Sequence, residues 1–277
     1  MSASDSLSNP IGVYDSGIGG LSVLRALQDL LTGEDWVYFG DQARVPYGNR
    51  SLEEIRQLAD GVTQFFLNRK VKAMVIACNT ASAAALKYLR GRYPELPIIG
   101  MEPAVKPAAE QTRSGHVGVL ATPSTFQGDL YASVVERFAQ DVAIHQATCP
   151  GLVAQIENGH LKTPKTLRIL REAIEPMLAE GVDTLVMGCT HFPFVIPAIT
   201  QISAGRARVI DPAPAIARQV RRVLEKNDQL SPRTSAGQTT YFTSGDALRM
   251  QRQIQQLLGI QTPARALRWH AEALEVE

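Results

Sequence analysis

Two cysteines carry the side chains best suited to chemistry in this sequence, and their surroundings match. Cys78 lies in the stretch VIACNTASA, and Cys189 lies in the stretch VMGCTHFP, 111 positions later. In each stretch a short apolar run ends in a small residue, then the cysteine, then two hydrogen-bonding residues. Such a strand-to-helix junction places the thiol at a helix N-terminus, which lowers the thiol pKa below its ordinary ~8.5. The pattern indicates one site with two equivalent thiols on opposite sides.

Two thiols on opposite sides of a ligand suit the removal of a proton from one face of a carbon and its return to the other. One must be a thiolate and the other a neutral thiol, and the roles exchange in the reverse direction. This is cofactor-free racemisation at a stereocentre beside a carboxylate, where N–H and hydroxyl groups stabilise the developing charge. Pyridoxal is not required, although the sequence alone leaves a Schiff-base lysine open.

Several candidate residues have a structural alternative. A buried cysteine is usually an inert small hydrophobe, and we keep that interpretation for Cys149, which precedes Pro150 and has no counterpart in the first half. Asp15 either caps a helix or orients the Cys78 thiol. His191 either is a polar residue in a first helical turn or accepts the thiol proton of Cys189.

Other polar residues also have both a structural and a functional interpretation. Asn79, Thr80 and Thr190 either cap helices or donate hydrogen bonds to a small polar ligand. By its position alone, near a helix end at Gly159, Glu157 is more consistent with a solvated carboxylate than with a catalytic one. The glycine-rich turn DSGIGG lets the backbone approach a ligand closely, but it has neither common phosphate-loop spacing.

An alternation of strands and helices must position these residues. Short apolar runs predict strands at residues 11–14, 36–40, 73–77, 97–101, 142–146, 184–188, 208–210 and 239–243, with another from residue 116. Ser51 and Glu54 form a capping box before a helix to about residue 68, and single helices are predicted to about residue 138 and from residue 244. Beyond that last helix we expect only a polar end. The alternation predicts an α/β fold with mostly parallel sheets flanked by helices, whose ligands bind beyond the carboxyl ends of the strands.

The two halves of the chain repeat. A constant offset of 111 pairs Leu67 with Leu178, Val75 with Val186 and Cys78 with Cys189. The run HVGVLATPST, starting at residue 116, repeats IGVYDSG, starting at residue 11, so that Gly12 matches Gly118 and Ser16 matches Thr122. Matching landmarks in the same order indicate a duplicated unit and therefore two similar domains.

Composition excludes several function classes. With 277 residues the chain can form one large domain or two of ordinary size, and its net charge of +1 gives no electrostatic case for nucleic acid or an anionic membrane. No apolar run approaches the ~20 residues of a membrane span, and the polar residues 1–10 predict a loose tail rather than a signal peptide. We therefore expect a cytoplasmic protein with three reduced cysteines and, because metal-ligand spacings are absent, no metal.

Four motifs carry a resemblance to a known family: DSGIGGLSV, PYG, ACNTASA and GCTHFP. From Ile11 to about Leu257 the chain resembles the glutamate racemases of the aspartate/glutamate racemase family. The resemblance implies cofactor-independent interconversion of L-glutamate and D-glutamate, a building block of bacterial peptidoglycan. It also implies two similar α/β domains related by pseudo-twofold symmetry, residues 1–103 with 212–277 and residues 104–211, with the active site in the cleft between them.

The resemblance assigns roles by position. It makes Cys78 and Cys189 the paired acid and base, the first acting on D-glutamate and the second on L-glutamate. It adds Asp15, His191 and Glu157 to the catalytic set, with Glu157 assisting the second thiol. The substrate-binding positions that it implies are Asp15, Ser16, Pro46, Tyr47, Gly48, Asn79, Thr80, Thr122, Thr190 and His191.

The expected partners are few: glutamate as the small-molecule substrate and a second copy of the chain in a homodimer, with neither nucleic acid nor membrane. Other functions are also compatible with the sequence. The nearest is a racemase for aspartate or another small amino acid, and a dicarboxylate-binding protein without catalysis is a second. A thiol oxidoreductase fits less well, because neither matched cysteine has a second cysteine in Cys-x-x-Cys spacing.

Overall fold

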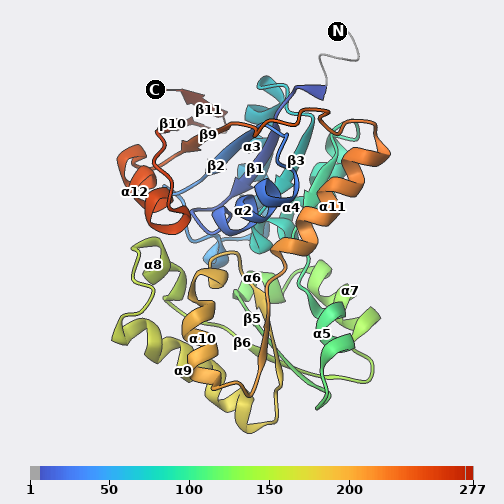
Figure 1. Cartoon of the computed structure of the whole chain (residues 1–277), viewed down its shortest axis with the longest axis vertical. Coiled ribbons are helices and arrows are strands. Elements are labelled where there is room, and N and C mark those ends of the chain that lie inside the picture. The colour runs from blue at the N-terminus through green and yellow to red at the C-terminus, as the bar shows by residue number, and fades with distance from the viewer. Residues whose placement is uncertain (1–6, 272, 277) are drawn as a thin grey trace. The chain divides into compact units, whose positions relative to one another are not determined.

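The computed structural model describes residues 7–271 and 273–276, and the chain divides into two compact units (Figure 1). The first unit comprises Met1–Met101 and Ala213–Glu277, and the second comprises Glu102–Pro212. Of the predicted N-terminal tail, residues 1–6 lie outside the described residues. Among the helices that are described, none combines the length and apolarity needed to cross a bilayer.

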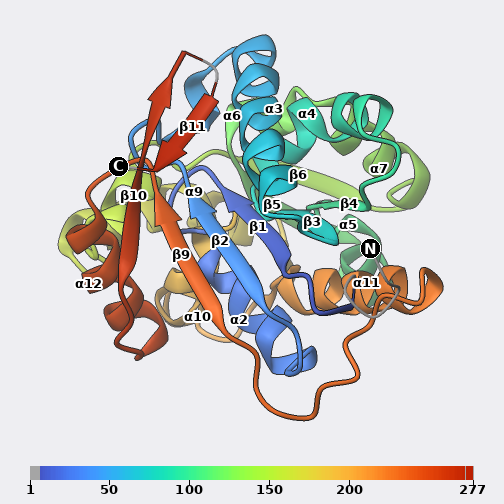
Figure 2. The same ribbon diagram turned by 90° about the horizontal axis from the view of Figure 1, so that it is seen from above.

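The first unit contains a seven-stranded sheet in the order β11-β10-β9-β2-β1-β3-β4 (Figure 2). All neighbouring strands are parallel except β11, which pairs antiparallel with β10. The strands are β1 (Ile11–Asp15), β2 (Trp36–Gly40), β3 (Ala73–Ile76), β4 (Ile98–Gly100), β9 (Thr239–Thr243), β10 (Ala264–His270) and β11 (Ala273–Val276). Residues far apart in the sequence thus meet in one sheet, since β9 pairs directly with β2.

Helices cover both faces of this first sheet (Figure 2). Helix α3 packs on α4 over one face, whereas α2 packs on α11 and α12 over the other. The helices are α2 (Leu21–Leu30), η1 (Tyr47–Asn49), α3 (Leu52–Asn68), α4 (Asn79–Arg92), α11 (Ala213–Lys226) and α12 (Ala247–Leu258). The predicted cap of α3 is present, because the Glu54 backbone N–H donates a 3.2 Å hydrogen bond to Ser51 Oγ.

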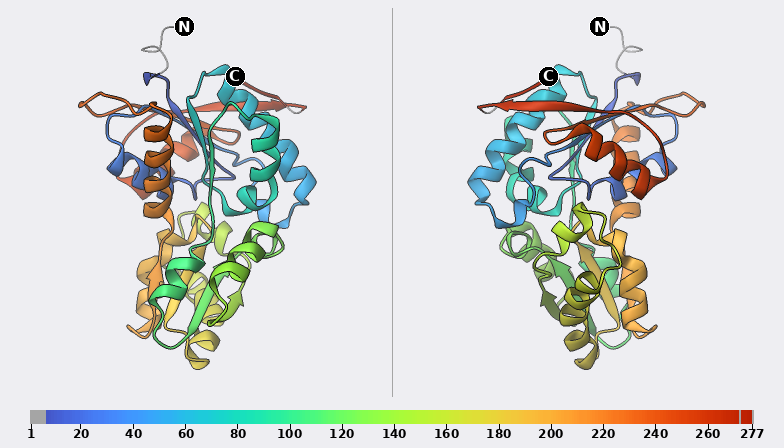
Figure 3. Two further views of the ribbon diagram at one scale, coloured as in Figure 1. Left: turned by 90° about the vertical axis from the view of Figure 1, so that its right-hand side faces the viewer. Right: turned by 90° about the vertical axis from the view of Figure 1, so that its left-hand side faces the viewer.

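The second unit contains a four-stranded parallel sheet in the order β6-β5-β7-β8. Its strands are β5 (His116–Ala121), β6 (Ala143–Ala147), β7 (Thr184–Gly188) and β8 (Arg208–Ile210). Helices α8, α9 and α10 share one apolar core with one face, and α5 and α7 share another with the opposite face (Figure 3). The helices are α5 (Val105–Gln111), α6 (Pro123–Phe126), α7 (Asp129–Phe138), α8 (Leu152–Glu157), α9 (Pro164–Ala179), η2 (Phe192–Val195) and α10 (Ile196–Ser203).

The two sheets share strand order and register, in agreement with the predicted duplication. The order β2-β1-β3-β4 in the first unit corresponds to β6-β5-β7-β8 in the second, and Val13 pairs with Val75 as Val119 pairs with Val186. The matched glycines also have matched contacts. A Cβ atom on Gly12 would lie 2.8 Å from the Phe66 ring, and one on Gly118 would lie 2.7 Å from the sulfur of Met177. Both strands therefore need glycine where a helix crosses closely, and the predicted α/β fold class is confirmed.

Some predicted elements are wrong. The end of the chain is not merely polar, because β10 and β11 add two strands to the first sheet. Strand β10 lies near the sheet edge and buries Leu267 between exposed arginines, so that its apolar pattern is too sparse to recognise. Helix α5 is not predicted, and the helix expected directly after Cys189 is a 3₁₀ turn, η2, followed by α10 from Ile196. The single helix expected to end near residue 138 is two, because the extended backbone of Gly128 separates α6 from α7.

The Asp183 carboxylate makes the second unit sensitive to acid. Burial raises its pKa, but hydrogen bonds from Thr112 and from the backbone N–H groups of Arg113 and Ser114 outweigh burial and hold the pKa at about 2. An unfolded aspartate has a pKa of about 3.9, so the stabilisation is complete above that pH and is lost as pH falls towards 2.

We therefore predict that replacing Asp183 by Asn flattens the acid limb of the stability curve. Between about pH 4 and pH 2 the free energy of unfolding should fall more steeply in the unaltered protein than in Asp183→Asn, because only the former must protonate a hydrogen-bonded carboxylate. Chemical unfolding followed by circular dichroism over this range measures both slopes. Equal slopes would contradict the assignment.

Candidate active site

The first half of the candidate site forms at the carboxyl ends of β1 and β3. These strands are paired up to Tyr14 and Ile76, so Asp15 and Ser16 lie beside Cys78. Cys78 is the N-cap of α4: its backbone is extended, and the Ala81 N–H donates to its sulfur at 3.4 Å. The thiol itself donates to Ser16 Oγ at 3.7 Å. The Cys78 sulfur is therefore buried at a helix N-terminus, which is the position that the sequence predicted for it.

Asp15 and Asn79 flank this thiol in the sequence-predicted positions. Asp15 is fully buried, and its Oδ2 accepts a 2.8 Å hydrogen bond from the Gly17 N–H, which holds the glycine-rich turn before α2. Asn79 is 2% exposed, and neither its Nδ2 nor its Oδ1 has a hydrogen-bond partner in the described part of the chain. An unpaired buried amide costs about 1–3 kcal/mol, which a polar ligand would recover. Thr80, also buried, follows it in the first turn of α4.

Tyr47 belongs to a hydrogen-bonded chain of buried side chains. Its hydroxyl donates to Asp41 Oδ2 at 2.6 Å and accepts from the Tyr14 hydroxyl at 2.8 Å. Burial, followed by nearby negative charge, raises the pKa of both tyrosines well above the ordinary value, so both remain neutral phenols. Tyr47 thereby fixes η1, which lies between Pro46 and Arg50.

Sequence reasoning missed Asp41 and Tyr14. The signal was available for Asp41, which directly follows β2 as Asp15 ends β1; its backbone N–H donates to the Asp15 carbonyl at 3.0 Å. The site in the first unit therefore spans the ends of three neighbouring strands.

The second half of the candidate site forms at the carboxyl ends of β5 and β7. These strands are paired up to Ala121 and Gly188, so Thr122 and Cys189 follow side by side. Thr122 caps α6, with the Thr125 N–H donating to its Oγ1 at 3.3 Å. Cys189 is 7% exposed, and Thr190 beside it is buried.

The Cys189 sulfur lies close to a histidine, which is held in turn by a buried carboxylate. His191 Nδ1 lies 3.9 Å from the Cys189 sulfur, and His191 Nε2 lies 2.8 Å from Glu157 Oε1. Burial lowers the pKa of His191, but its hydrogen bonds with Cys189 and Glu157 outweigh burial and raise that pKa well above the ordinary value. The Cys189 sulfur therefore lies beside an imidazolium.

The position-based interpretation of Glu157 as solvated is wrong. Its side chain is 3% exposed because the last turn of the short helix α8 faces inwards, burying Ile156 and Glu157 together. In the structure the side chains of Glu157, His191 and Cys189 thus contact one another in series.

The remaining thiol behaves differently. Cys149 is buried in the same apolar cluster as Cys189, and burial, followed by the charge of Cys189, raises its pKa to about 12. It stays a neutral thiol at physiological pH, which agrees with the structural interpretation.

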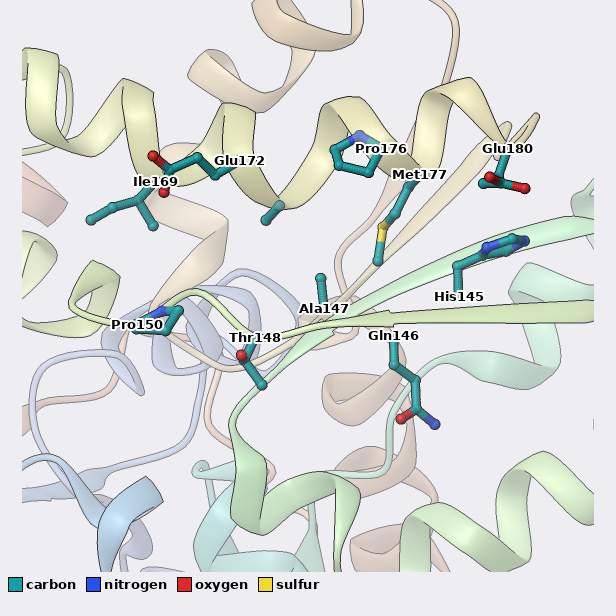
Figure 4. Close-up of a pocket in the computed structure, with 11 residues that line it drawn as sticks. His145, Gln146, Ala147, Thr148, Pro150, Ile169, Glu172, Pro176, Met177 and Glu180 are labelled. Carbon is teal, nitrogen blue, oxygen red and sulfur yellow. The ribbon is translucent and has the colours of Figure 1, made fainter.

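A separate pocket of about 430 Å³ lies between β6 and α9 of the second unit (Figure 4). His145 and Thr148 line it from the β6 side, and Glu172, Met177 and Glu180 line it from α9. It contains none of the residues predicted to act in the site. The candidate site therefore rests on the strand ends and not on this pocket.

We predict that Glu157→Gln lowers the pKa of His191, because the substitution removes the carboxylate that stabilises the imidazolium. The side-chain nitrogen signals of His191 in an NMR pH titration report the change. The matched control is Glu172→Gln, which alters an exposed glutamate of α9 in the same unit. It should leave the pKa of His191 unchanged. An unchanged His191 titration in Glu157→Gln would show that the contact has no electrostatic effect.

Comparisons with known proteins all find racemases. The profile of the Asp/Glu/Hydantoin racemase family matches residues 11–220. A glutamate racemase from Ectopseudomonas mendocina is 49% identical over 252 residues, which cover 91% of this chain and 95% of that protein.

Solved structures are similar over almost the whole chain. The crystal structure of a glutamate racemase isoform from Bacillus anthracis has a TM-score of 0.85 at 29% identity, covering 96% of this chain and 98% of that one. A glutamate racemase from Francisella tularensis, solved in complex with D-glutamate, has a TM-score of 0.81 at 29% identity, covering 93% and 96% of the two chains.

Proposed function

The chain belongs to the Asp/Glu/Hydantoin racemase family, and on this premise we propose that it is a glutamate racemase that supplies D-glutamate for peptidoglycan. One observation carries the proposal: two buried thiols occupy equivalent positions in a repeated arrangement of strands, one just after β3 and the other just after β7. The names of its relatives, and the D-glutamate bound to the Francisella protein, support glutamate as the substrate.

The proposed mechanism is a two-base proton transfer without a cofactor. With D-glutamate, the Cys78 thiolate takes the α-proton while the electron pair of the broken C–H bond remains on the α-carbon and its carboxylate. The neutral Cys189 thiol then donates its proton to the opposite face, which yields L-glutamate and leaves a Cys189 thiolate. In the other direction Cys189 is the base and Cys78 is the acid. The mechanism requires both thiols to reach one α-carbon from opposite faces.

The surrounding residues have distinct roles in the proposal. His191, held by Glu157, stabilises the Cys189 thiolate when L-glutamate is the substrate. The α4 N-terminus and the Ser16 hydroxyl stabilise the Cys78 thiolate instead. Asp15 orients the Cys78 thiol. Polar groups of Asn79, Thr80, Thr122, Thr190 and the loop around Tyr47 bind the ammonium and carboxylate groups of the substrate.

Asn79 is the strongest of these binding residues on physical grounds. Its amide offers both a donor and an acceptor, and both are buried without a partner among the described residues. A ligand that carries both carboxylate and ammonium groups can satisfy both.

The expected homodimer stays a prediction. Analytical ultracentrifugation would measure the oligomeric state.

We predict that Cys78→Ser and Cys189→Ser each lose turnover by a factor on the order of 10²–10⁴, because a serine hydroxyl is a far weaker acid than a thiol. Circular dichroism of the amino acid follows the decay of optical activity from either enantiomer. The control is Cys149→Ala, which removes a buried thiol of the second unit and should keep activity. Either serine variant with unaltered kcat would rule out the two-base mechanism.

The decisive test of the function is racemisation in D2O. During the first turnovers of L-glutamate, the D-glutamate formed should carry deuterium at the α-carbon while the remaining L-glutamate keeps its proton. Proton NMR of the separated enantiomers measures both. L-aspartate in a parallel sample decides the nearest rival: exchange with aspartate alone would reassign the substrate, and an unchanged α-proton with both would refute racemisation.

A further inference from the structure

The loop that carries Tyr47 is held by residues from the C-terminal part of the chain. This segment, residues 41–50, connects β2 to α3 and is called here the Tyr47 loop. Thr243 Oγ1 donates to Gln42 Oε1 at 3.0 Å, and Gln42 Nε2 donates to Gln253 Oε1 at 2.8 Å. The Ala43 backbone N–H donates to Ser244 Oγ at 3.0 Å. Two successive loop residues are thus bound by residues some 200 positions later.

Asp41 is the point where these contacts converge. Its side chain is fully buried, and its Oδ1 accepts hydrogen bonds from Ser244 Oγ at 2.5 Å and from the Trp269 indole N–H at 2.9 Å. Its Oδ2 accepts the hydrogen bond from Tyr47. Donors from the C-terminal segment therefore occupy one oxygen, which orients the other towards Tyr47.

The Trp269 ring has a second contact with the loop. The Arg44 guanidinium carbon lies 4.4 Å from the centroid of that ring, and Arg44 Nη1 lies 3.7 Å from Asp41 Oδ1. Arg44, Asp41 and Trp269 thus form a compact cluster of a cation, a carboxylate and an indole.

We propose that Trp269 and Ser244 are positioning residues for the substrate: they orient Asp41, and Asp41 holds Tyr47 and its loop in the binding conformation. The role in binding rests on the proposed function, since it takes residues 46–48 as part of the substrate site. Both positioning residues lie beyond residues 11–220, the part of the chain that the family profile matches. They act through Asp41 and do not touch the substrate themselves.

The test separates positioning from general stability. Trp269→Phe keeps an aromatic ring beside Arg44 and removes only the indole N–H. Loss of a hydrogen bond to a charged group should raise KM for glutamate about tenfold and change kcat much less, because the loop binds substrate and transition state alike. Hydrogen exchange of the amides in residues 42–50 should accelerate in the same variant.

The matched control is Trp36→Phe. Trp36, the only other tryptophan, begins β2, at the opposite end of that strand from Asp41. The same chemical change there should leave KM and the exchange of the Tyr47 loop unchanged. It therefore corrects for the effect of replacing an indole by a phenyl ring in the same sheet.

Ser244 supplies a second and independent variant. Ser244→Ala should raise KM and accelerate loop exchange as Trp269→Phe does, whereas Ser244→Thr keeps the hydroxyl and should restore both. If Trp269→Phe fails to fold, the serine pair still decides. Unchanged KM and unchanged loop exchange in folded Ser244→Ala and Trp269→Phe would overturn the proposal.

Failure of this proposal is distinguishable from failure of the proposed function. Hydrogen exchange reports the loop whether or not glutamate is racemised. An unaltered protein that does not racemise glutamate would refute the function. Active variants whose loop and KM stay unchanged would refute only the positioning role.

Discussion

The parallel pairing of β1 with β3 in the first unit, and of β5 with β7 in the second, determines which side chains meet in the candidate site. Because β1 and β3 end at the same edge of their sheet, Asp15 and Cys78 become neighbours although 63 positions separate them. The pairing of β5 with β7 brings Thr122 to Cys189 in the same way. A slip of one residue in either register would turn every following side chain to the opposite face and separate the thiol from its partners.

The two copies of the unit keep this backbone arrangement and differ in what surrounds the thiol. The Cys78 sulfur contacts the Ser16 hydroxyl and the Ala81 backbone N–H, and the buried Asp15 ends the strand beside it. The Cys189 sulfur meets a histidine that a buried carboxylate keeps positively charged. Equivalent backbones thus give two thiols with different neighbouring side chains.

Local sequence patterns predicted much of the fold and the positions of both thiols after strand ends. Such patterns suffice because a strand end and the first turn of a helix can be recognised within about ten residues. Contacts between residues far apart in the sequence could not be predicted in this way. Glu157 looks solvated in the sequence and is buried only because α8 packs inwards against η2. Trp269 lies in a half-exposed strand among arginines, and nothing nearby in sequence indicates that it bonds to Asp41.

The asymmetry between the copies extends from the thiols to the sheets. In the first unit β9 pairs with β2 on its outer side, and the residues after β9 hold the loop that follows β2. In the second unit the corresponding strand β6 is an edge of its sheet, since no described strand pairs with its outer side. On that side no described strand is available to hold the loop after β6 as the residues after β9 hold the loop after β2. In the first unit the C-terminal segment therefore restrains the loop after β2, because each hydrogen bond to Asp41 restricts the conformations that this loop can adopt.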